Sequence, residues 1–90
     1  MPEVVFDRDK DAANLRYHNI SLRAARFFDF DGALERDDDR EDYGERRIIA
    51  IGRLNRDLYT LIYTPRGATV RAISLRRAER HEREDYLASR

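Results

Sequence analysis

The chain has 90 residues, of which 41% are hydrophobic and 40% are charged, and its mass of 10.7 kDa fits one small domain covering residues 1–90. It contains no cysteine, which excludes disulfides, thiolate metal sites and cysteine nucleophiles. No apolar run is long enough for a transmembrane helix, and the acidic N-terminus lacks the apolar region of a signal peptide, so we expect a cytoplasmic protein with no membrane partner.

The zero net charge conceals a difference between the two halves of the chain. Residues 1–45 carry seven basic and thirteen acidic side chains, whereas residues 46–90 carry eleven basic and five acidic ones. Seventeen of the basic residues are arginine and one is lysine. Guanidinium groups bind phosphate through two parallel hydrogen bonds, although an arginine-rich composition also follows from a GC-rich genome. We therefore expect an acidic and a basic region on the folded surface.

The N-terminal part of the sequence predicts one strand and two helices. Residues 4–6 form a short apolar run typical of a strand. A helix is expected over residues 10–18, capped by Asp9. Ser21 can cap a second helix that ends near Asp29, with its apolar face formed by Ala24, Ala25 and Phe28.

An acidic stretch follows, and then a series of strands. Residues 33–35 are consistent with a short edge strand, and the acidic run 37–42 is expected to be a solvated loop. Three strands joined by short turns are predicted at Arg46–Leu54, Leu58–Thr64 and Thr69–Leu75, and a helix from about Arg76 to the C-terminus. The expected fold class is α+β, an antiparallel β-sheet meander packed by two N-terminal helices and a C-terminal helix.

Two kinds of side chain suggest chemistry. His18 ends the first predicted helix, where its imidazole suits acid–base catalysis, although a histidine there also stabilises a helix through its dipole. Converging guanidiniums would bind phosphate, unless they only pair with the acidic loop. The arginines that would converge if the last helix packs across the meander are Arg47, Arg71, Arg76, Arg77, Arg80 and Arg83.

Aromatic and metal-binding patterns add less. Tyr17 and Tyr86 could stack on unpaired bases or pass protons, or could belong to a core or an interface. The sequence has no glycine-rich phosphate loop, and His81 is followed at the zincin spacing by Asp85 instead of a second histidine. Residues 37–42 lack the glycine and terminal glutamate of a calcium loop. We predict no metal and no cofactor.

The chain carries a series of motifs between residues 6 and 86, namely Phe6-Asp7, Lys10, Asn14–Ser21, Phe28–Asp31, Glu45–Gly52, Arg71–Ala78, Glu82-Arg83 and Tyr86. Their order and spacing resemble the BrnT family of bacterial toxins. Tyr17 stands where that family usually has lysine, and Asn19 where it usually has glycine.

The resemblance implies a RelE-like fold and a type II toxin that inhibits translation by metal-independent mRNA cleavage, through attack of the ribose 2′-hydroxyl. It also implies neutralisation by a BrnA-like ribbon-helix-helix antitoxin, and contact with operator DNA only through the antitoxin complex. The alternative is a non-catalytic nucleic-acid-binding or regulatory module. The residues predicted to be catalytic are His18, Arg47, Arg71 and Arg76. Those predicted to contact the RNA substrate are Tyr17, Glu45, Arg77, Arg80, Arg83 and Tyr86.

Overall fold

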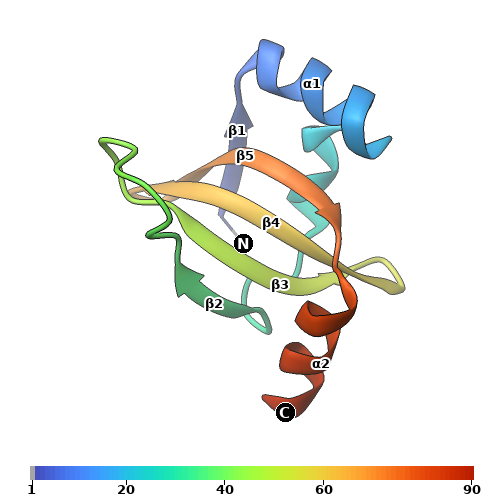
Figure 1. Ribbon diagram of the computed structural model, residues 1–90. Coiled ribbons are helices and arrows are strands. Elements are labelled where there is room, and N and C mark those ends of the chain that lie inside the picture. The colour runs from blue at the N-terminus through green and yellow to red at the C-terminus, as the bar shows by residue number, and fades with distance from the viewer. Residues whose placement is uncertain (1) are drawn as a thin grey trace.

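A computed structural model describes residues 2–90 and shows an α+β fold built on a five-stranded sheet (Figure 1). Its elements in chain order are β1 (Glu3–Phe6), α1 (Arg8–His18), the 3₁₀ helix η1 (Leu22–Phe27), β2 (Leu34–Asp37), β3 (Ile48–Leu54), β4 (Asp57–Arg66), β5 (Thr69–Arg77) and α2 (Arg80–Ala88). Among these residues, no helix is long and apolar enough to cross a membrane.

The sheet has the strand order β1-β5-β4-β3-β2 and is mixed. Strands β2 to β5 form the predicted antiparallel meander, but β1 pairs with β5 in parallel, with Glu3 opposite Thr69 and Phe6 opposite Ala72. The expectation of a purely antiparallel sheet is therefore wrong. A parallel neighbour cannot be joined by a tight turn, so the short turns that predict β3 to β5 carry no information about the partner of β1.

The main core lies on one face of the sheet, which we call the core face. The segment η1 covers it and places the fully buried side chains of Leu22, Ala25 and Phe28 against the strands. The Phe28 ring packs directly on Gly52, where an added Cβ would lie only 2.8 Å from the ring. This close approach explains why the isoleucine-rich run of β3 is followed by a glycine.

The N-terminal helices differ in detail from the prediction. Helix α1 is capped by Asp7 instead of Asp9, since the Asp7 carboxylate accepts a hydrogen bond from the backbone N–H of Lys10 at 3.3 Å. The second helix is the short 3₁₀ element η1, capped as predicted by Ser21. The Ser21 hydroxyl donates to Asp11 at 2.8 Å, which ties this turn to α1. Short 3₁₀ segments are a usual way to connect packed elements.

The C-terminal helix begins later than predicted. Arg76 and Arg77 belong to β5, and α2 starts only at Arg80. A capping box fixes this start, because the Glu79 side chain accepts from the backbone of Glu82 while the Glu82 side chain accepts from the backbone of Glu79. Arg76 therefore does not lie on the same helix as Arg80 and Arg83, contrary to the predicted start of that helix.

Candidate active site

The second face of the sheet carries polar and basic side chains, and we call it the arginine face. Thr60 and Thr64 of β4 both lie on this face, because side chains alternate between the two faces along a strand. Thr60 is paired with Arg76 of β5, and Thr64 is paired with Arg71. Arg71 and Arg76 are an odd number of residues apart, which would put them on opposite faces of a regular strand. A register shift leaves Ile73 unpaired, so both arginines lie on the same face.

A buried carboxylate holds Arg76. Its two terminal nitrogens donate to the two oxygens of Glu82 at 2.7 and 3.0 Å, and Glu82 also accepts from the Thr60 hydroxyl at 2.9 Å and the Glu79 N–H at 2.7 Å. Burial alone would raise the pKa of Glu82, but these hydrogen bonds outweigh it and lower the pKa to about 2. The same pairing raises the pKa of Arg76. The Arg76 side chain remains 28% exposed, so it can still reach a ligand.

Arg47 lies at the other end of the arginine face. Its guanidinium carbon is 3.9 Å from the centre of the Tyr43 ring, and its Nε is 3.7 Å from a Glu45 oxygen. Glu45 also accepts from the Thr64 hydroxyl at 3.1 Å. Among residues 2–90 the buried Nε of Arg47 has no hydrogen-bond partner. Unsatisfied buried donors are rare, and the Glu45 carboxylate at 3.7 Å gives this one an electrostatic contact without a hydrogen bond.

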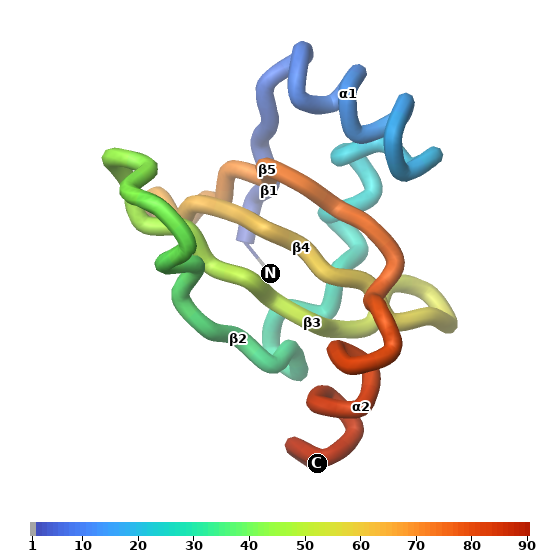
Figure 2. Tube along the Cα trace, viewed as in Figure 1, coloured from blue at the N-terminus to red at the C-terminus, as the bar shows by residue number. Residues whose placement is uncertain are grey.

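The C-terminal half of α1 is fastened to the edge of β5 by Asn14. The buried Asn14 amide donates to the carbonyls of Ile20 and Leu75, each at 2.8 Å, and its oxygen accepts from the Leu75 N–H at 2.9 Å. Because β1 pairs only with the first part of β5, the backbone of Leu75 is left for this side chain. Figure 2 shows α1 beside this edge of the sheet.

This contact places His18 beside the bulge of β5. A cavity of about 170 Å³ opens there, next to the strand segment between Arg71 and Arg76. Both His18 and Tyr17 are exposed, Tyr17 to 73%. The residues that line the cavity are Lys10, Ala13, Asn14, Tyr17, His18, Ile73 and Ser74.

The remaining predicted contact residues do not join this group. Arg77 pairs with Asp57 at 3.1 Å, while Arg80 pairs with Glu84 on the exposed side of α2. Arg83 is exposed on the same helix. Tyr86 is 4% exposed and packs in a second core cluster with Ile51 and Leu58.

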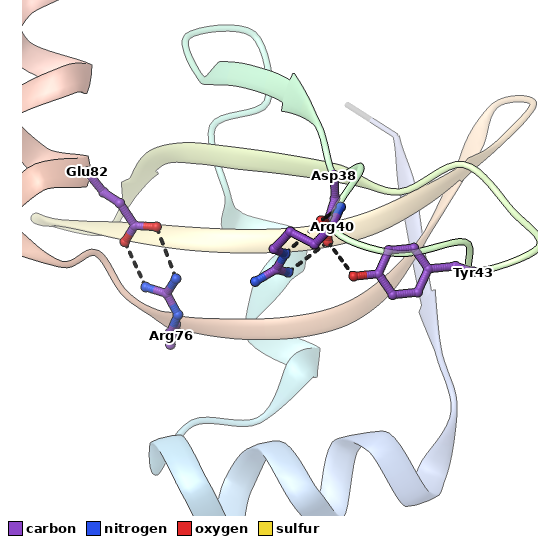
Figure 3. Close-up of polar contacts among 5 residues, drawn as sticks. All are labelled: Asp38, Arg40, Tyr43, Arg76 and Glu82. Carbon is purple, nitrogen blue, oxygen red and sulfur yellow. Dashed lines mark hydrogen bonds and ion pairs between the residues drawn. The ribbon is translucent and has the colours of Figure 1, made fainter.

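Sequence reasoning missed a second clamped arginine on the loop between β2 and β3. The acidic run 37–42 is not wholly a solvated loop: Asp37 ends β2 and Asp38 is buried. Asp38 accepts from Nε and Nη2 of Arg40 at 2.7 and 2.8 Å and from the Tyr43 hydroxyl at 3.2 Å (Figure 3). The hydrogen bond from Arg40 lowers the pKa of Asp38 to about 2. The only sequence signal is the spacing of aspartate, arginine and tyrosine, which is hidden in a run of charges.

Comparison with known proteins identifies the family of this chain. The family model described as "Ribonuclease toxin, BrnT, of type II toxin-antitoxin system" matches residues 6–82. The chain belongs to the BrnT family. A crystal structure of the Brucella abortus ribonuclease toxin BrnT superposes with a TM-score of 0.69 at 23% sequence identity, covering 89% of this chain and 100% of that chain. This likeness shows that the two proteins share a fold. A search of curated proteins gives no match.

One group of side chains in this BrnT-family chain has the spacing of a metal site. Within residues 2–90, ligand atoms of Glu79, His81 and Glu82 lie within 4.8 Å of one another. Both Glu82 oxygens already accept hydrogen bonds from Arg76, so a cation would have to displace a buried ion pair. The donor set therefore fits a helix start better than a metal.

Replacing Asn14 with alanine should destabilise this BrnT-family fold by about 2 kcal/mol, since it leaves the Leu75 amide and carbonyl without partners. RNA cleavage should fall further than stability explains, because the end of α1 that carries His18 loses its attachment to β5. Urea unfolding measures the first effect, and cleavage assayed well below the melting temperature measures the second. An alanine variant with unchanged stability would contradict the role given to Asn14.

Proposed function

We propose that this protein is an endoribonuclease toxin that cleaves mRNA without a metal ion and thereby inhibits translation. The observation that carries the proposal is the bulge at Ile73, because it puts Arg71 and Arg76 on one face of the sheet, while Ile73 and Ser74 between them line a cavity together with His18. Two guanidiniums that flank this strand segment on one face, with an imidazole at its edge, are the kinds of group that phosphodiester cleavage needs. Membership of a family of ribonuclease toxins supports the same reaction.

RNA supplies its own nucleophile in this mechanism. His18 accepts the proton of the ribose 2′-hydroxyl as its oxygen forms a bond to the adjacent phosphorus. The bond from phosphorus to the 5′ oxygen breaks, and that oxygen takes a proton from Tyr17 or from water. The products are a 2′,3′-cyclic phosphate and a free 5′-hydroxyl.

Arginine side chains stabilise the charge that develops on the phosphorane. Arg71 and Arg76 donate to its non-bridging oxygens, and the partly exposed guanidinium of Arg47 extends this anion site. Glu45 orients Arg47 through their contact at 3.7 Å. Tyr86 is buried, so we assign base stacking to the exposed Tyr17.

The surroundings of this site suggest how RNA is led to it and how it is blocked. Arg83 is exposed on α2 and extends the positive surface beyond Arg76, whereas Arg77 and Arg80 are already paired with Asp57 and Glu84. We further propose that residues 1–90 act as one RelE-like domain in the cytoplasm. A BrnA-like ribbon-helix-helix antitoxin would neutralise it, and only that complex would bind operator DNA.

The purified chain is expected to cleave single-stranded RNA in the presence of EDTA, leaving cyclic phosphate ends. Its expression alone should arrest growth, and coexpression of the adjacent antitoxin gene should relieve the arrest. Activity lost with EDTA and restored by a divalent ion would instead indicate a metal-dependent nuclease. RNA that binds but keeps its length would favour the non-catalytic binding module.

A further inference from the structure

Arg40 is held in one orientation by a buried carboxylate. The Asp38 side chain has no exposed surface, and it engages Nε and Nη2 of Arg40 together. The Arg40 side chain itself is 61% exposed. Among residues 2–90, its remaining nitrogen, Nη1, has no protein partner. The clamp therefore leaves one edge of a fixed guanidinium pointing into solvent.

Asp38 also links Arg40 to the group around Arg47. The Tyr43 hydroxyl donates to Asp38 at 3.2 Å, and the Tyr43 ring lies beneath the Arg47 guanidinium. One carboxylate thus orients Arg40 directly and supports the aromatic surface on which Arg47 rests.

Arg40 and Arg76 form two similar clamps over the same stretch of sheet (Figure 3). Each guanidinium is bound in a bidentate manner by a buried carboxylate, Asp38 in one case and Glu82 in the other. The pKa of Arg76 is raised mainly by its hydrogen bonds to Glu82, and the positive charge of Arg40 lowers it to a smaller extent. The two guanidiniums are therefore within electrostatic range of each other. Like charges held toward each other repel, and an anion between them removes that repulsion.

We propose that Arg40 is a further RNA-binding residue that contacts a backbone phosphate on the arginine face, and that Asp38 is its positioning residue. This inference rests on the proposed function. RNA is a chain of regularly spaced phosphates, so a fixed second guanidinium fits a polyanion better than a single small anion. Orientation by Asp38 also reduces the side-chain entropy lost when RNA binds.

The sign of a charge change gives the sharpest test. Asp38→Asn removes a negative charge, which by simple electrostatics would strengthen RNA binding. If Asp38 positions Arg40, the same substitution should weaken the binding of a non-cleavable 2′-O-methyl RNA about fivefold. Asp37→Asn is the matched control, because Asp37 is exposed and pairs with Arg46 at 2.8 Å. It should leave the affinity unchanged or slightly higher.

Arg40→Ala tests the phosphate contact itself. It should weaken binding about tenfold and reduce the slope of log affinity against log salt by about 0.7, the value for one phosphate contact with a single strand. Arg46→Ala removes the same charge from an exposed ion pair beside the core face. It should change neither the RNA affinity nor the salt slope. The double variant Asp38→Asn/Arg40→Ala should bind no more weakly than Arg40→Ala, because positioning has nothing left to act on.

Failure of this inference can be told from failure of the proposed function. A wild-type chain that neither binds nor cleaves RNA overturns the proposed function. If the wild type cleaves RNA but Arg40→Ala binds RNA as tightly as Arg46→Ala does, the inference is overturned and the proposed function is not. Should Asp38→Asn not fold by circular dichroism, Arg40→Lys replaces it: loss of affinity with retained charge supports a fixed guanidinium, and wild-type affinity contradicts it.

Discussion

Replacing Glu82 with glutamine is expected to lower the free energy of unfolding by about 3 kcal/mol, because it breaks one partner of a buried ion pair. Glutamine has nearly the same shape as glutamate, but it lacks the negative charge that strengthens the hydrogen bonds from Arg76, Thr60 and the Glu79 backbone N–H. Urea denaturation measures the change. Glu84→Gln is the control on the same helix, since its pair with Arg80 is exposed, and it should change stability by less than about 0.5 kcal/mol.

The acid response provides a second measurement on the same variant. The pKa of Glu82 is about 2 in the folded protein against an ordinary value of 4.5, so its carboxylate stabilises the fold above about pH 4.5. That stabilisation is lost as the pH falls toward 2. The variant should therefore lose less stability than the wild type over this interval. The pKa of Asp38 is also lowered to about 2, so the pH dependence of stability should be reduced in the variant and not abolished. Equal losses in both proteins would contradict the assignment.

Replacing Arg71 with alanine is expected to lower RNA cleavage 100- to 1,000-fold, about the loss seen when one donor to a developing negative charge is removed. Stability should hardly change, because within residues 2–90 Arg71 forms no ion pair. His18→Ala should lower cleavage about 10²–10⁴-fold, the range for general acid–base catalysis. Single-turnover assays with a defined RNA measure the chemical step in both variants.

The matched control is Arg56→Ala, which removes an exposed guanidinium from the turn between β3 and β4. It should cleave within twofold of the wild type, so a larger loss would show that total charge, and not the arginine face, governs activity. If folded Arg71→Ala and His18→Ala both cleave like the wild type, the active site lies elsewhere.

Much of the sheet could be predicted because local patterns determine it. The run of residues 48–51 is buried throughout, as an uninterrupted apolar stretch indicates. The turns around Arg56 and Gly67 are short, so they fix β3, β4 and β5 as antiparallel neighbours. The role of Ser21 as a cap could likewise be recognised from its residue type and its place before an apolar segment.

The site could be predicted only in part, because its geometry depends on contacts between distant segments. Nothing near Ile73 marks it as the residue that the sheet leaves unpaired, although that shift decides which arginines share a face. The charged sequence after Leu75 suits a helix, and only the capping box at Glu79 moves its start beyond Arg77. Asp38 resembles its acidic neighbours until the loop folds and buries it.

The parallel pairing of β1 with β5 has a consequence for the order in which the sheet forms during folding. The segment from α1 to β4 lies between β1 and β5 in the sequence, so the edge strand pairs with a partner far along the chain. Closing so long a loop is slow, because its entropic cost precedes any gain from the new contacts. The edge of β5 beside Arg71 is thus expected to be completed late in folding, after the local meander of β3, β4 and β5 has formed.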